Sequence, residues 1–194
     1  MSVLAEYVHA VDEALRERAA HVMSITDFAE LYRSDPGAEL IEGEVYMTPA
    51  GLYHDKIVIA LASEIHQYLR KNPIGEVYGS SAGFRLTNRT VVSPDVSYVA
   101  LNKLPGGKTP EEFANFPPDL AVEIVSPYDR EQDTLQKADL YLQHGTRLVW
   151  VIYPRQRTAF VYLADGSMKR IQTDGSLDGD DVLPGFICKL SDIL

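Results

Sequence analysis

The stretch that decides the fold is Asp119-Leu120-Ala121-Val122-Glu123-Ile124-Val125. Apolar and β-branched residues dominate it, which is typical of a buried strand. Side chains alternate along a strand, so Glu123 shares a face with Ala121 and Val125. An acid in such surroundings is costly to bury unless it is paired or binds a cation. The stretch therefore predicts a strand that carries a functional carboxylate.

A second acid lies in similar surroundings upstream. Asp95 belongs to Val91-Val92-Ser93-Pro94-Asp95-Val96-Ser97-Tyr98-Val99, which also predicts a strand. The long 101–118 connection would let the two strands lie side by side, so that the two acids could meet. A hard cation such as Mg²⁺ is typically held by one or two carboxylates, together with water and substrate phosphate. The alternative is that each acid faces solvent on a half-exposed sheet, and for either acid alone that alternative is the better one.

Two segments show apolar residues at helical spacing, which predicts helices over 54–71 and 130–144. Gly145 ends the second helix. Segments rich in β-branched and apolar residues predict strands over 76–87, 91–100, 119–125 and 147–152. The resulting order of helix, three strands, helix, strand indicates a single mixed α/β domain.

Further elements are expected at both ends of this core. A leading helix is expected in 1–21, with the domain proper over 22–194. Two short strands are expected about Glu42-Gly43, one helical turn at Glu111–Ala114, and a C-terminal hairpin, 158–163 with 168–172, about Asp165-Gly166.

Composition limits the function further. The 194 residues carry a net charge of −10, which argues against a non-specific nucleic-acid coat but leaves room for a local basic groove. Cys188 is the one cysteine, so no disulfide forms within the chain and a reducing compartment is expected. No apolar run reaches the length of a membrane span. We therefore expect a cytoplasmic protein without a membrane segment.

Lys137 is the candidate cation near the acids. It shares a helix face with Asp133 and Tyr141, each four residues away. One interpretation is an intrahelical ion pair between Asp133 and Lys137. The other is that Lys137 orients an attacking water or neutralises phosphate beside the two carboxylates.

The order of these motifs resembles the Uma-two family, restriction-endonuclease-like proteins assigned to the PD-(D/E)XK nuclease superfamily. The resemblance covers about residues 22–190. The motifs that carry it are Glu39-Leu40-Ile41-Glu42-Gly43-Glu44, His54, Ser93-Pro94-Asp95-Val96, Val122-Glu123-Ile124-Val125-Ser126-Pro127, Asp133, Lys137, Tyr141, Gly145 and Val149-Trp150-Val151-Ile152. It implies a restriction-endonuclease-like core with an N-terminal helix and a C-terminal hairpin.

The resemblance also implies a site and a reaction. Asp95 and Glu123 would bind Mg²⁺, or Mn²⁺ in its place, with the Ile124 carbonyl as a third ligand, and Glu39 and His54 would support them. The implied reaction is phosphodiester hydrolysis, with DNA as the favoured substrate and a homodimer as the working form. For His54, a capping or surface histidine is an equal alternative, and Glu39 could instead be an acid at a strand edge.

One departure from the superfamily pattern leaves a second function open. Val125 occupies the place of the lysine in the usual Glu-x-Lys, and Lys137 would be its migrated replacement. Otherwise the chain would be a catalytically weak or inactive scaffold that binds nucleic acid or a protein partner.

Overall fold

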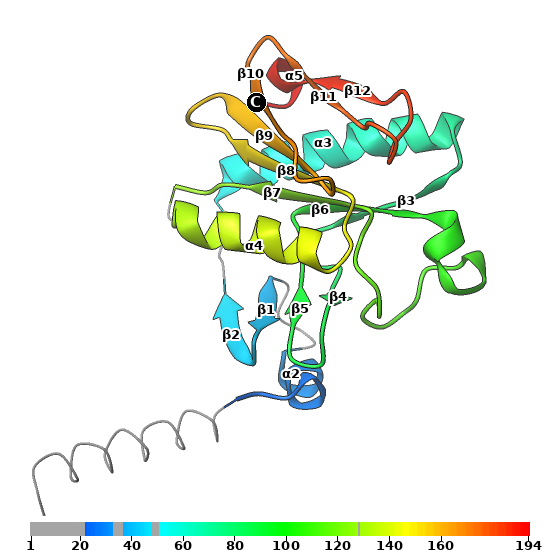
Figure 1. Ribbon diagram of the computed structural model, residues 1–194, viewed down its shortest axis with the longest axis vertical. Coiled ribbons are helices and arrows are strands. Elements are labelled where there is room, and N and C mark those ends of the chain that lie inside the picture. The colour runs from blue at the N-terminus through cyan, green and yellow to red at the C-terminus, as the bar shows by residue number, and fades with distance from the viewer. Residues whose placement is uncertain (1–21, 33–36, 48–50, 128) are drawn as a thin grey trace, which may run out of the picture.

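A six-stranded sheet forms the centre of the computed structural model, which describes residues 22–32, 37–47, 51–127 and 129–194 (Figure 1). Its strands follow the order β10-β9-β8-β7-β6-β3. Their bounds are β3 Gly75–Gly79, β6 Val96–Ala100, β7 Leu120–Ile124, β8 Leu148–Tyr153, β9 Thr158–Leu163 and β10 Met168–Gln172. Neighbours are antiparallel except β7 and β8, which are parallel and are joined through α4 (Glu131–Gln143). The helix expected in 1–21 lies outside the described residues.

Two helices cover opposite faces of this sheet (Figure 1). The apolar side of α3 (Leu52–Lys71), including Ile57 and Leu61, packs against Val122 and Ile124 of β7. The other helix, α4, packs on the face that carries Ala121. The alternation predicted for the 119–125 strand is therefore confirmed, and Glu123 lies on the α4 face.

A smaller sheet of four strands, in the order β2-β1-β5-β4, holds the segment before α3. Its bounds are β1 Ala38–Ile41, β2 Glu44–Met47, β4 Phe84–Arg85 and β5 Val91–Val92. Glu42 and Gly43 both have positive φ, which confirms the predicted turn between two short strands. Helix α2 (Ile25–Leu31) is preceded by its N-cap residue Ser24, whose side chain accepts a hydrogen bond from the Asp27 N–H.

The C-terminal part confirms the predicted hairpin of β9 and β10 and adds elements that the sequence patterns had not indicated. These are β11 Ser176–Asp178, β12 Ile187–Lys189 and α5 Leu190–Ile193. Two short 3-10 turns, η1 Leu101–Lys103 and η2 Pro105–Gly107, lie in the long connection before β7. None of the helices within the described ranges is long and apolar enough to cross a membrane.

Three predicted elements are wrong in detail. The strand expected over 76–87 is divided between β3 of the large sheet and β4 of the small sheet. The strand expected over 91–100 is split, since 91–92 pairs in the small sheet and 96–100 in the large one, which leaves Asp95 between them. Pro94 at this break has no N–H to contribute to a ladder. The turn expected at Glu111–Ala114 is not helical. Instead, Ala114 forms a bridge with Phe84, because its N–H and carbonyl bond to the Gly83–Arg85 segment.

Candidate active site

Asp95 and Glu123 meet where β6 and β7 begin to diverge. Val96 pairs with Val122 across these antiparallel strands, so one step further along the register Asp95 comes opposite Glu123. The Ile124 N–H donates to Oδ2 of Asp95 at 2.7 Å. A side chain thus replaces a backbone acceptor at this point, and the carboxylate is fixed at the edge of the ladder.

His54 reaches the same carboxylate from the first turn of α3. Its Nε2 lies 3.1 Å from Asp95 Oδ2, and its side chain is only 10% exposed. Burial lowers the pKa of His54, but the hydrogen bond and the charge of Asp95 outweigh burial, so the pKa is raised. The alternative of a surface or capping histidine is therefore wrong.

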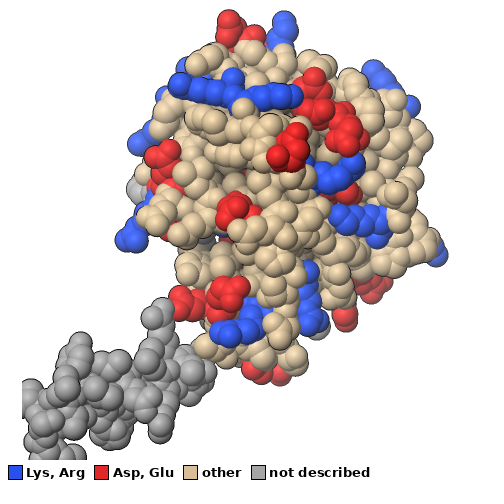
Figure 2. Space-filling view, in the orientation of Figure 1, with Lys and Arg blue, Asp and Glu red and all other residues tan. Residues whose placement is uncertain are grey.

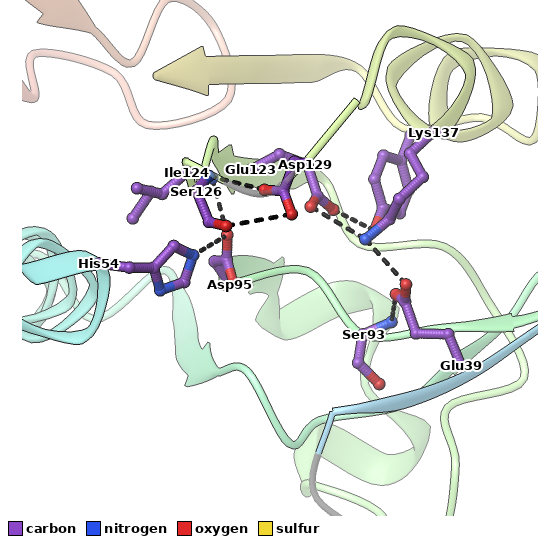
Figure 3. A network of polar contacts seen from close by, with 10 residues as sticks. Glu39, His54, Ser93, Asp95, Glu123, Ile124, Ser126, Asp129 and Lys137 are labelled. Carbon is purple, nitrogen blue, oxygen red and sulfur yellow. Dashed lines mark hydrogen bonds and ion pairs between the residues drawn. The ribbon is translucent and has the colours of Figure 1, made fainter. Parts of the chain in front are cut away.

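Lys137 joins two buried acids on the other side of the site (Figure 3). Its Nζ lies 2.9 Å from Glu123 Oε2 and 3.0 Å from Glu39 Oε2. Glu39 also accepts from the Ser93 N–H at 2.7 Å, which ties β1 to the loop that carries Asp95. Glu39 is 5% exposed, so the alternative of an exposed acid at a strand edge is wrong.

The charged side chains of the site shift one another's pKa values. Burial raises the pKa of Glu123, Lys137 lowers it, and the charges of Asp95 and Glu39 raise it again, giving about 7. Burial lowers the pKa of Lys137, but Glu123 and Glu39 outweigh burial and raise it. The lysine is consequently a permanent ammonium group, while Glu123 takes up a proton near neutral pH.

Tyr141 is a polar partner of Glu123 that the sequence analysis named among the family motifs without assigning it to the site. Its hydroxyl donates to Glu123 Oε1 at 2.7 Å, and burial raises its pKa well above the ordinary value. Its spacing of four residues from Lys137 puts both side chains over Glu123. Asp133, on the same stripe, is exposed and forms no ion pair with Lys137 among the described residues. The intrahelical alternative for Lys137 is therefore wrong.

Asp129 is a further acid that no sequence pattern indicated. Its carboxylate accepts from the Ser126 N–H at 2.6 Å and from the Ser126 hydroxyl at 3.2 Å. Its charge contributes to the raised pKa of His54. Asp129 thus ties the connection between β7 and α4 close to the site.

The donor set suits a hard divalent cation that keeps part of its hydration. No three His, Cys, Asp or Glu side chains of the described ranges are arranged to hold an ion together. Magnesium, however, is commonly held by one or two carboxylates, with water and substrate phosphate completing the shell. Each Glu123 oxygen accepts one hydrogen bond, and a carboxylate oxygen offers about two lone pairs. Glu123 and Asp95 therefore retain capacity for an ion.

One cavity lies beside the site rather than in it. It has a volume of about 1150 Å³ and is lined by α2, residues 81–85 and residues 109–116. Ser93 is its one link to the carboxylate network, and neither Asp95 nor Glu123 lines it. We place the chemistry at the carboxylates, because none of Glu39, His54, Asp95, Glu123 and Lys137 lines this cavity.

Similarity to known proteins agrees with this fold. A family model described as "Uma2: Putative restriction endonuclease" matches residues 25–191. The crystal structure of "a putative nuclease belonging to DUF820 from Anabaena variabilis ATCC 29413" superposes with a TM-score of 0.79 at 21% sequence identity, covering 88% of this chain and 97% of that one. No curated protein matches the chain.

The sheet with α3 and α4 on its two faces, and with acids where β6 and β7 diverge, defines a protein of the restriction-endonuclease-like class. Within that class, the chain belongs to the Uma2 family, as its motifs had indicated.

Proposed function

We propose that this protein is a divalent-metal-dependent endonuclease that hydrolyses phosphodiester bonds in DNA. The observation that carries the proposal is the convergence of Asp95, Glu123 and Lys137. Two acids from neighbouring chain segments and one partly buried ammonium group meet at a single point of the sheet. A purely structural ion pair needs only one acid for each lysine, whereas this group holds more negative than positive charge.

In this proposal Asp95 and Glu123 bind Mg²⁺, or Mn²⁺ in its place, with the Ile124 carbonyl as a further ligand. Such an ion supplies charge stabilisation at a phosphoryl oxygen and lowers the pKa of bound water. The chain's own residues prepare the site. His54 orients Asp95, and Tyr141 and Lys137 orient Glu123.

Lys137 has the second chemical role. Its ammonium group is held by Glu39 and Glu123 at the edge of the carboxylate pair. There it would position the attacking water and offset negative charge that builds on the phosphate. Glu39 accordingly acts through Lys137 and does not contact the substrate.

A second candidate function is a nuclease-fold scaffold that binds nucleic acid or a protein partner without cutting efficiently. Val125, in the place where the superfamily has a lysine, is the observation in its favour. We further propose a homodimer, because a cutter of duplex DNA must address two strands, and a cytoplasmic location, which the lone Cys188 suits.

The test is cleavage of supercoiled plasmid, single-stranded DNA and RNA with Mg²⁺, Mn²⁺ or a chelator. We expect metal-dependent nicking of DNA that is lost in Asp95→Asn and Glu123→Gln. Glu64→Gln, which alters an exposed acid on α3, is the matched control and should cut like the unaltered protein. Cleavage that survives both site substitutions would be a contaminant and would contradict the proposal. Binding without cleavage would favour the scaffold.

A further inference from the structure

Three exposed arginines gather at the end of the sheet that carries the active site. Arg155 and Arg157 lie in the turn between β8 and β9, and Arg170 lies on β10. None of the three forms an ion pair with another described residue. The neighbouring Lys169, by contrast, pairs with Asp180. These arginines therefore keep their charge available in a chain whose net charge is −10.

The strand register relates Arg170 to the candidate site. Glu123 pairs with Val151, Val151 with Phe160, and Phe160 with Arg170. Residues paired in this way lie in one row on one face of the sheet. Three strand spacings of about 4.8 Å place Arg170 about 14 Å from Glu123 along this row.

The turn between β8 and β9 relates the other two arginines to the site. β7 and β8 are parallel and their ends coincide, since the Val125 N–H bonds to the Ile152 carbonyl. The turn begins directly after Tyr153, so Arg155 and Arg157 project past this end of the sheet by about 10 Å at most, at about 3.3 Å per residue. The beginning of α4 lies at the same end (Figure 1).

The backbone of Arg157 and the side chain of Arg170 are held in place by contacts with neighbouring residues. Arg157 has φ +48°, its N–H bonds to Pro154, and its carbonyl accepts from the Thr173 hydroxyl at 2.8 Å. The Arg170 guanidinium lies 5.8 Å from the centre of the Phe160 ring. Its Nε bonds to Thr158 at 3.4 Å, which leaves the terminal nitrogens as donors.

We propose that Arg155, Arg157 and Arg170, here called the arginine rim, bind phosphates of the nucleic-acid substrate beside the bond that is cut. The proposal rests on the proposed nuclease function. The distance of about 14 Å from Glu123 corresponds to about four base-pair steps of 3.4 Å, so the rim contacts the substrate outside the reacting phosphate.

Acidic and basic side chains are interspersed over the face drawn in Figure 2, so overall attraction to DNA is weak there. Binding must then depend on particular cations, which makes the rim testable by charge removal. The experiment measures anisotropy of a labelled duplex with the full chain in chelator, over a range of salt concentrations. The rim variant is Arg155→Ala/Arg157→Ala. The matched control is Arg70→Ala/Lys71→Ala, which removes two exposed charges from the far end of α3.

We expect the rim variant to bind at least about tenfold more weakly, with the slope of log affinity against log salt reduced by about 2, and the control to bind like the unaltered protein. Three results would contradict the proposed role of the arginine rim. They are an equal loss of duplex affinity in both variants, no loss of affinity in either variant, and no binding by the unaltered protein. Because chelator prevents metal-dependent cleavage, failure of the plasmid test would contradict the nuclease function without affecting this result. A rim variant that binds unchanged would overturn the rim and leave the nuclease function standing.

Discussion

The Lys137 ammonium group lies 2.9 Å from the Glu123 carboxylate, although the two residues are on different elements, a helix and the strand before it. Val125, which stands in the superfamily's lysine position, lies on the same face of the sheet as Glu123, the face that α4 covers. It packs against the buried apolar residues between the sheet and α4. The helix therefore delivers a cation to the acid that the strand itself does not supply. This relationship makes the migrated-lysine hypothesis specific enough to test.

The first prediction concerns Lys137→Met under saturating Mn²⁺. Its cleavage rate should fall by about 10²-fold or more, because the group that positions water and offsets phosphate charge is lost. Lys103→Met is the matched control, since Lys103 pairs with buried Asp119 before β7 and should leave the rate unchanged. If Val125→Lys restores activity in the Lys137→Met background, a lysine at either position brings its ammonium group to the same place in the site. A rate equal to that of the unaltered protein would contradict the hypothesis.

The second prediction concerns the hydroxyl of Tyr141. Tyr141→Phe removes a buried hydrogen bond to a carboxylate, which should cost about 2 kcal/mol and lower Tm by roughly 4–8 °C. It should also weaken Mn²⁺ binding in calorimetry, because Glu123 is then held only by Lys137. Tyr68→Phe removes a hydroxyl bond to Pro184 away from the site and is the control. If both variants bind Mn²⁺ equally well, Tyr141 stabilises the fold without positioning Glu123.

The third prediction concerns pH. The pKa of Glu123 is raised to about 7, so below this value a proton competes with a cation for the carboxylate. Affinity for Mn²⁺ should fall by about tenfold per pH unit below 7 and level off above it. Calorimetry from pH 5.5 to 8.5 measures this profile. An affinity independent of pH over that range would mean that Glu123 is already ionised throughout.

The same shift has a consequence for stability. The folded-state pKa of Glu123 lies above its ordinary value of 4.5, so the folded state binds the proton more tightly than the unfolded state. Its stabilising contribution is thus complete below pH 4.5 and is lost as pH rises toward 7. Glu123→Gln, which cannot ionise, should lack this part of the pH dependence when unfolding is followed without metal.

The fourth prediction concerns assembly. Residues 1–21 lie outside the described residues, and their Leu4, Val8, Val11 and Leu15 recur at helical spacing. We expect the full chain to be a dimer at micromolar concentration and a chain lacking residues 1–20 to be monomeric. Light scattering distinguishes these states. A monomer mass for the full chain would contradict the dimer, and a dimer that survives the deletion would place the contact elsewhere.

The sequence by itself determined the main elements and most of the candidate site. Regular hydrophobic periods predicted α3 and α4, because burial of one helix face constrains every turn. The Asp165-Gly166 turn signal predicted the hairpin of β9 and β10. The strand and helix settings indicated Asp95, Glu123 and Lys137, and the resemblance added Glu39 and His54. The structure brings all five together. A motif lists which residue types recur, but it holds no distances.

Only the tertiary structure decided how those residues interact. The break at Pro94 sends the chain from one sheet to the other, so Asp95 bonds to the Ile124 N–H rather than continuing a strand. Glu39 reaches Lys137 only because the small sheet packs beside α4. These contacts join residues far apart in the chain, and local propensity does not record such pairings. The raised pKa of Glu123 and the row from Glu123 to Arg170 arise in the same way, from burial and strand register that form only when the whole sheet is assembled.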